Sequence, residues 1–172
     1  MPSDINDKVA IFIDGSNIFH GCREYDPNFK IDYVKLVDVL LNGRKLLRPY
    51  YYGSFDPSNP DQANRQKRFH QALQEKGFHV TIKPLRRRDD NKIEKGVDVA
   101  LVTDMLSLGF KNAYDVAILV SGDNDFVHAV EELKAHGKIV EVAMFENAIG
   151  GELKRMADKF ISLNKIADRI RK

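Results

Sequence analysis

The stretch AILVSGDNDF, residues 117–126, decides the fold class of this chain. Four apolar residues run directly into Ser121 and Gly122, and the carboxylates of Asp123 and Asp125 follow with one residue between them. A short, continuously apolar run of this kind indicates a buried strand of a parallel sheet, and the polar residues after it mark the carboxyl end of that strand. Two neighbouring anions repel each other, so another group must compensate their charge.

Apolar runs and amphipathic stretches alternate along most of the chain, which predicts an α/β fold with a central, mostly parallel sheet flanked by helices. Strands are expected at residues 9–14, 46–55, 78–85, 115–120 and 138–145, with a final strand or extended piece at 160–164. Helices are expected at residues 17–24, 32–41, 62–76, 97–110, 126–137 and 150–158. In the helix at 97–110, the apolar stripe expected to face the core consists of Val99, Val102, Leu106 and Phe110.

Length and composition predict one domain, residues 1–172, in a reducing compartment. A chain of 172 residues with 43% hydrophobic residues is long enough to bury one sizeable core. The 27 Lys and Arg residues nearly balance the 25 Asp and Glu residues, which excludes a generally polycationic protein. Cys22 is the one cysteine, so a disulfide framework is excluded and a cytoplasmic location is expected. No signal peptide or membrane-spanning stretch is evident in the sequence.

Acidic side chains follow two of the predicted strands. Asp14 ends the strand at 9–14, and Asp123 and Asp125 follow the strand at 115–120. The carboxyl ends of parallel strands meet at one edge of the sheet, where ligands bind at the point at which the strand order reverses. Asp98, one turn into an apolar helix, is expected to join them. Oxygen ligands of this kind suit Mg²⁺ or Mn²⁺, so a cation is expected to offset the repulsion.

Each of these residues also has a plainer interpretation. Asp14 before a glycine fits an Asx turn, and Asp123 or Asp125 fits the cap of the helix that follows. The functional interpretation is favoured for the set, because acids from three separate elements converge less often by chance. Asn17 either starts the helix that follows or orients a phosphate or a metal-bound water, and Ser121 either ends its strand or hydrogen-bonds an acid. Asp104 lies on another helix face, where a structural salt bridge is expected.

A local excess of positive charge lies between Asp61 and Lys95, a segment that contains ten Lys or Arg residues and five Asp or Glu residues. The residues expected to contact the phosphates of a nucleic acid are Arg86, Arg87, Arg88, Lys92 and Lys95. Contacts of this kind give salt-dependent affinity that does not depend on base sequence. The alternative is a solvated basic loop. Tyr50, Tyr51 and Tyr52 are not counted as base-stacking residues, because strand alternation places one or two of them in the core.

Three blocks carry a resemblance to a known family: VAIFIDGSNIFHG (9–21), KGVDVALVTDM (95–105) and AILVSGDNDFVHAVEELKAHGKIVEV (117–142). Their order and spacing resemble the NYN domain family, the LabA-like branch of the PIN-like nuclease superfamily, over about residues 8–165. The resemblance implies a three-layer PIN-like (Rossmann-like) fold and a metal-dependent ribonuclease activity with Mg²⁺ or Mn²⁺. Placed on this sequence, it makes Asp14, Asp98, Asp123 and Asp125 the catalytic metal ligands, supported by Asn17 and Ser121.

Related sites often carry a glutamate at the helix position, whereas this chain has Asp98 there and Glu94 one turn earlier. The expected substrate is single-stranded RNA, and a homodimer would lengthen its binding groove. The rival function is a regulatory module that holds RNA or a protein with little or no turnover. A dinucleotide-binding domain and a P-loop NTPase are excluded, because the residues after the first strand, DGSNIFHG, supply neither glycine pattern.

Overall fold

The computed structural model describes residues 3–88, 91–93 and 96–172, with residues 87, 88 and 91–93 described by their backbone alone. A parallel sheet of six strands, in the order β3-β2-β1-β6-β7-β8, forms the centre of the protein, and β4 and β5 form a separate antiparallel hairpin. The strands are β1 (Lys8–Asp14), β2 (Lys45–Phe55), β3 (His79–Pro84), β4 (Arg86–Arg88), β5 (Asn91–Ile93), β6 (Val116–Val120), β7 (Ile139–Met144) and β8 (Lys159–Ser162).

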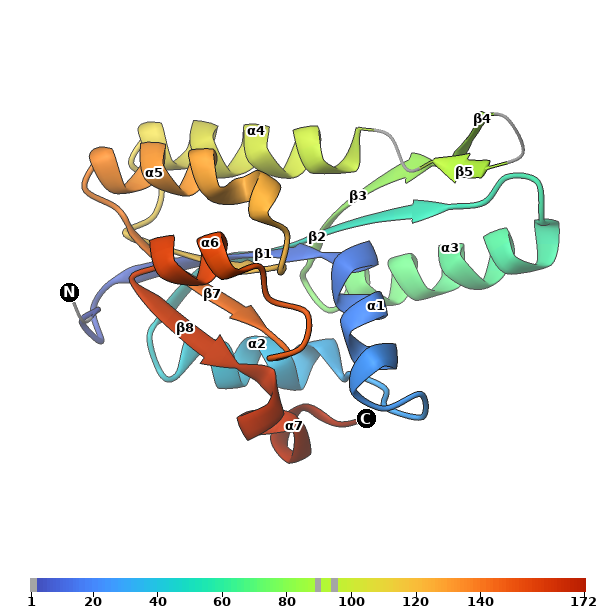
Figure 1. The fold of residues 1–172 in the computed structure, drawn as a ribbon, viewed down its shortest axis with the longest axis horizontal. Helices are drawn as coiled ribbons and strands as arrows, with labels where there is room; N and C mark the ends of the chain where they lie inside the picture. The colour runs from blue at the N-terminus through green and yellow to red at the C-terminus, as the bar shows by residue number, and fades with distance from the viewer. Residues whose placement is uncertain (1–2, 89–90, 94–95) are drawn as a thin grey trace.

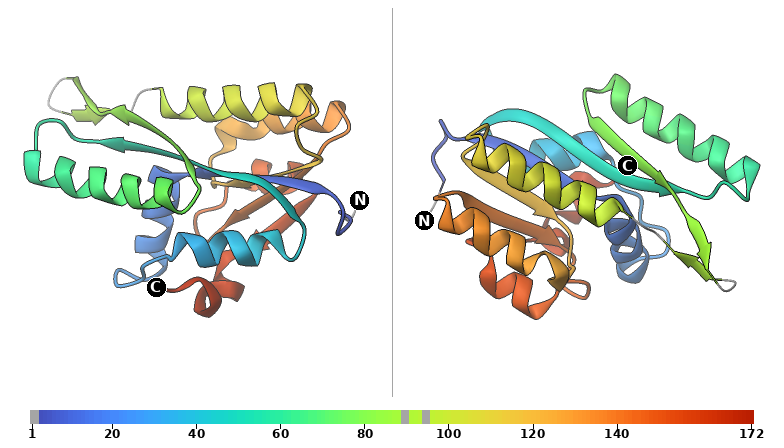
Figure 2. Two further views of the ribbon diagram at one scale, coloured as in Figure 1. Left: turned by 180° about the vertical axis from the view of Figure 1, so that it is seen from behind. Right: turned by 90° about the horizontal axis from the view of Figure 1, so that it is seen from above.

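Helices cover both faces of the sheet, which gives three layers (Figures 1 and 2). One face packs against α1, α2, α3 and α7, and the other packs against α4, α5 and α6. The helices are α1 (Gly15–Tyr25), α2 (Tyr33–Leu41), α3 (Pro60–Glu75), α4 (Val97–Phe110), the short 3-10 helix η1 (Asn124–Phe126), α5 (Val127–Ala135), α6 (Gly151–Met156) and α7 (Leu163–Ile170). The expected α/β class with a parallel central sheet is confirmed.

The strand order reverses between β1 and β6. The chain builds β1, β2 and β3 outward in one direction, then returns to pair β6 with the other side of β1 and continues to β8. All residues of β6 and all but the first of β1 are buried, and alternate side chains enter opposite layers of the core. Every side chain of β1 beyond Lys8 is therefore held on its own face, which strongly specifies the register between these two strands.

Several expectations about individual elements are wrong. Only part of the expected α4 stripe faces the core: Val102 and Leu106 are half-buried against it, whereas Val99 is 69% exposed and Phe110 is 47% exposed. The residues that α4 buries fully are Val97, Leu101 and Met105. Because α4 is apolar around most of its circumference, its periodicity does not identify the inner face. All three tyrosines at 50–52 are buried, rather than one or two.

The chain also forms two elements that were not expected from the sequence. The final strand expected at 160–164 forms as β8, but it ends at Ser162, and residues 163–170 form α7. The charged connection contains the β4–β5 hairpin. The helix at 62–76 begins earlier, at Pro60, because the Asn59 side chain caps it and proline fits the first helical position. No helix in the described ranges is both long and apolar enough to cross a membrane.

A buried ion pair joins the turn after α2 to β7. The Arg44 guanidinium donates to both carboxylate oxygens of Glu141, at 2.8 and 3.0 Å. It also donates to the carbonyl oxygens of Leu40 and Leu41. Both charged groups of the pair are therefore hydrogen-bonded in the interior. Removal of one partner leaves the other buried with an uncompensated charge.

We predict that Glu141→Gln lowers the free energy of unfolding by about 3–5 kcal/mol, because Arg44 loses its counter-ion in the interior. The matched control is Glu131→Gln, whose partner His128 is exposed, and the expected loss there is below about 1 kcal/mol. Urea unfolding followed by circular dichroism measures both. Equal losses in the two variants would contradict this account of the buried pair.

Candidate functional site

Asp14 lies at the carboxyl end of β1 and also caps α1. Its Oδ1 accepts a hydrogen bond from the backbone N–H of Asn17 at 3.2 Å, and its Oδ2 accepts one from the Ser121 hydroxyl at 3.1 Å. The residue is buried, so these donors replace much of the water that a carboxylate loses on burial. Asp14 therefore caps a helix, where an Asx turn was its plainer interpretation, and it also lies beside the end of β6, as expected.

Asn17 and Ser121 join the ends of β1 and β6. The Asn17 side-chain oxygen accepts from the backbone N–H of Gly122 at 2.8 Å. The Ser121 hydroxyl oxygen accepts from the backbone N–H of Asp123 at 3.2 Å while its own proton goes to Asp14. The structure therefore places both predicted supporting residues beside Asp14, where they hold the two loops in a defined relation.

The loop after β6 lies tightly against the segment before α6. A Cβ atom on Gly122 would lie 1.9 Å from the carbonyl oxygen of Ala148, so only glycine fits here. The Gly122 carbonyl accepts from the backbone N–H of Gly150 at 2.7 Å. Asp123 then caps η1 by accepting from the N–H of Asp125 at 2.9 Å. The close packing holds the half-buried Asp123 side chain at the rim.

Asp98 reaches the same rim from the other side of the sheet. It lies in the first turn of α4, whose N-cap is Gly96, a residue with φ of 91° and no side chain to cap the helix. The Asp98 side chain is exposed rather than buried. The first turns of α1 and α4 both border this rim, and their partial positive charge favours the anionic side chains that meet there.

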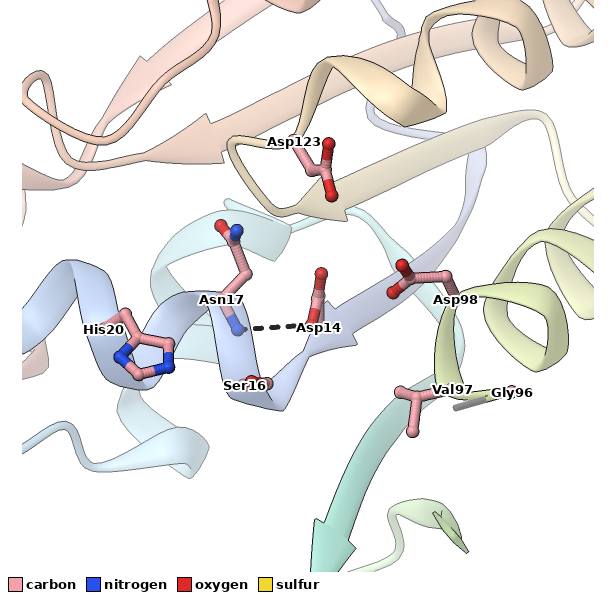
Figure 3. Close-up of a pocket in the computed structure, with 8 residues that line it drawn as sticks. All are labelled: Asp14, Ser16, Asn17, His20, Gly96, Val97, Asp98 and Asp123. Carbon is pink, nitrogen blue, oxygen red and sulfur yellow. Dashed lines mark hydrogen bonds between the residues drawn. The ribbon is translucent and has the colours of Figure 1, made fainter. Parts of the chain in front are cut away.

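Asp14, Asp98 and Asp123 line one cavity of about 180 Å³. Figure 3 shows their carboxylates pointing toward a common space, with Asn17 beside them. Ser16, His20, Gly96 and Val97 complete the lining. Three of the four predicted acids therefore come together at the point where the strand order reverses, the usual position of a ligand site in an open parallel sheet.

The remaining predicted acids lie elsewhere or outside the described residues. Asp125 is exposed and is not part of the cavity lining, so its role as a ligand stays a prediction. Asp104 accepts a hydrogen bond from the buried Tyr52 hydroxyl at 2.7 Å, where a salt bridge had been expected. Burial, followed by this bond, raises the pKa of Tyr52 well above its usual value. Glu94 lies outside the described residues.

Four of the five predicted basic residues are described by the structure, and they lie on the carboxyl side of the sheet. β3 is parallel to β2, so its end and the exposed Arg86 that follows lie on the carboxyl side of the sheet. For Arg87, Arg88 and Lys92 the structure describes backbone positions in the β4–β5 hairpin, and Lys95 lies outside the described residues. The placement of Arg86 is compatible with an RNA contact, and the contacts of all five residues stay predictions.

One residue of the cavity was passed over in the sequence. His20 is exposed, and it lines the cavity because it lies one helical turn after Asn17 on the same face of α1. The signal that identifies it is this three-residue spacing from Asn17. Within the described part of the chain, no group of three or more His, Cys, Asp or Glu side chains is arranged to hold a metal ion by itself.

Comparison with known proteins identifies the family. The NYN domain pattern matches residues 8–164. Low amplitude and bright protein LabA of Synechococcus elongatus is 30% identical over 176 residues, which cover 96% of this chain and 88% of that protein. The crystal structure of VPA0982 from Vibrio parahaemolyticus, a protein of unknown function, superposes with a TM-score of 0.80 at 28% identity, with complete coverage of both chains. The protein therefore belongs to the NYN domain family, as a LabA-like member.

Proposed function

We propose that this protein is a metal-dependent ribonuclease that hydrolyses phosphodiester bonds of single-stranded RNA. The observation that carries the proposal is the convergence of Asp14, Asp98 and Asp123 on one cavity at the point where the strand order reverses. NYN domains are in general nucleases, which supports the same reaction class. The substrate is an anion, so a site made of carboxylates requires a cation between the two.

The donor set of the cavity fits Mg²⁺ or Mn²⁺. Its charged ligands are carboxylates, and these ions prefer oxygen. Mg²⁺ commonly takes one or two carboxylates and completes its shell with waters and substrate phosphates, so a full protein cage is not required. Asp14 and Asp123 would hold the ion, with Asp98 at the open side of the cavity. When bound, such an ion supplies an activated water and offsets charge on the reacting phosphate.

The residues of this chain prepare the site in three ways. The hydrogen bonds from Ser121 and from the Asn17 backbone hold the Asp14 carboxylate in one orientation. The first turns of α1 and α4 present backbone N–H groups at the rim, where a phosphate binds favourably. In the overall reaction, the oxygen of a water molecule bonds to phosphorus, one P–O bond of the chain breaks, and the departing ribose oxygen takes up a proton.

We predict that the purified protein cleaves labelled single-stranded RNA with Mn²⁺ or Mg²⁺ and not with EDTA. Asp123→Asn should lower the cleavage rate at least about 100-fold, because outer-shell partners of metal ligands alone contribute about 10–100-fold. Asp125→Asn should lower it less, since that side chain lies outside the cavity lining. Asp168→Asn, at an exposed position on α7, is the matched control and should cut at the wild-type rate.

Two outcomes would contradict the ribonuclease proposal. The first is cleavage that persists in EDTA or in Asp123→Asn, which would place the activity elsewhere or in a contaminant. The second is binding of RNA by wild type and Asp123→Asn without cleavage by either. That result would favour the regulatory module that holds RNA with little or no turnover.

The basic side of the rim gives a separate prediction. Arg86→Gln should weaken RNA binding to a similar extent for all sequences and lower the salt dependence of the affinity by about 0.7 in log–log slope, the value for one phosphate contact to a single strand. Lys45→Gln, at the exposed start of β2 and the opposite edge of the sheet, is the control. Equal effects of the two substitutions would show that Arg86 contributes only to overall charge.

Two further expectations stay predictions. A homodimer would use either the basic segment or the outer face of α4, which exposes Val99 and Phe110. A monomeric mass by light scattering in dilute solution would count against it. The second expectation is a cytoplasmic location, for which localisation of the tagged protein in cells is the direct measurement.

A further inference from the structure

A second cavity, of about 510 Å³, adjoins the acidic one. It lies at the carboxyl ends of β1 and β2, between the first turns of α1, the middle of α3 and residues 29–33. Ser16 belongs to the lining of both cavities, so the two meet at the first turn of α1. A ligand that spans them would place one part beside Asp14 and the next part in the second cavity.

Aromatic rings form much of this second cavity. The Phe69 ring lies 5.7 Å from the rings of both Tyr33 and Tyr51, measured between centroids, and Tyr33 lies 5.4 Å from Tyr51. Phe69 on α3 and Phe19 on α1 are 37% and 54% exposed, although both are large apolar side chains. Two partly exposed rings from different helices offer stacking surfaces for a flat aromatic ligand.

Polar atoms without partners also line the second cavity. His70 is 4% exposed, and its Nδ1 has no hydrogen-bond partner. Gln66 lies one helical turn earlier on the same face of α3, and its buried side-chain oxygen also has no hydrogen-bond partner. Buried polar groups are nearly always satisfied, so these two atoms indicate a ligand that supplies donors or acceptors. Burial lowers the pKa of His70, so its ring is neutral, and Nδ1 either donates or accepts according to the tautomer.

The charge of the second cavity is opposite to that of the first. Its lining includes Lys30, Arg65 and Lys172, and the residues described there include no Asp or Glu. The ligand that fits is therefore a flat ring with hydrogen-bonding edges joined to an anion, which is the chemistry of a nucleotide. A nucleobase stacks on aromatic rings and is read through its polar edge, and its phosphate pairs with Lys or Arg.

We propose that this cavity is a nucleobase pocket that takes up an unpaired base of the RNA strand adjoining the scissile phosphate, stacked by Phe19 and Phe69 and hydrogen-bonded by Gln66 and His70. The inference rests on the proposed function, which places the phosphate at the acidic cavity. It makes the pocket the element that aligns the strand and selects the base beside the cut. An inserted base must be unpaired, which accounts for a single-stranded substrate.

Binding is measured separately from turnover, with Ca²⁺, which also takes oxygen ligands, in place of Mg²⁺ or Mn²⁺. The measurement is the fluorescence anisotropy of a labelled short RNA and of the same RNA with one base removed, the abasic position being moved along the strand. Phe69→Ala should raise the Kd of intact RNA about tenfold, within the range for loss of one stacked base. One abasic position should weaken wild-type binding by a similar factor, and Phe69→Ala should then add no further loss. Leu46→Ala, at an exposed apolar position near the start of β2 and outside both cavities, is the control and should bind as wild type.

A second variant separates binding from folding. Gln66→Leu removes a buried atom that has no partner, so it should keep or raise the unfolding midpoint in urea. It should nevertheless reduce the differences in Kd among strands that carry A, G, C or U at the sensitive position. A residue with a structural role alone would leave these differences unchanged.

The outcomes distinguish this inference from the ribonuclease proposal. If the protein cleaves RNA with metal, and neither Phe69→Ala nor any abasic position changes the Kd for RNA, the nucleobase pocket is overturned and the ribonuclease proposal stands. If RNA binding depends on Phe69 and on one base position but no RNA is cleaved, the nucleobase pocket is supported and the ribonuclease proposal is overturned. A third outcome is that the protein binds free AMP, GMP, CMP or UMP, that Phe69→Ala abolishes this binding, and that the affinity for RNA does not depend on Phe69. The cavity would then be a site for free nucleotides, and the inference would be overturned.

Discussion

The parallel pairing of β1 with β6 is the constraint on which the rest of the site depends. Their register runs from Val9 opposite Val116 to Ile13 opposite Val120, through residues that are all fully buried. A shift of one residue would send every one of these side chains to the opposite layer of the core, so the register is strongly specified. Asp14 and Ser121 therefore leave the sheet side by side, close enough for the hydrogen bond at 3.1 Å that joins them.

Two neighbouring cavities of opposite charge give the rim its chemical character. The first gathers carboxylates close to the first turns of α1 and α4, where backbone N–H groups moderate their repulsion. The second combines aromatic rings with basic side chains on a face formed by α1 and α3. An RNA strand has an anionic backbone, which needs a cation to approach the acids, and flat bases, which need rings to stack on. The two cavities match these two parts in adjacent positions.

The acidic cavity could be predicted from the sequence because its logic is topological. Asp14 ends one strand and Asp123 follows the end of another. Because parallel strands end at one edge of the sheet, the proximity of these two acids follows from the strand order. The nucleobase pocket could not be predicted in this way. Phe19 and Phe69 lie on amphipathic helices, where the pattern gives no sign of which ring stays partly exposed. The exposure of Val99 on α4 could not be predicted for a related reason. That helix carries apolar residues on most sides, so its sequence does not show which of them face the core.

The most direct test of the central claim is the position of a bound cation. Anomalous diffraction from crystals soaked in Mn²⁺ locates the ion without reference to activity. The account predicts one or two peaks in the acidic cavity, within coordinating distance of Asp14 and Asp123, and no peak there in Asp123→Asn crystals. A well-occupied Mn²⁺ elsewhere, with the cavity empty at saturating concentration, would contradict the claim that these acids form a metal-dependent site.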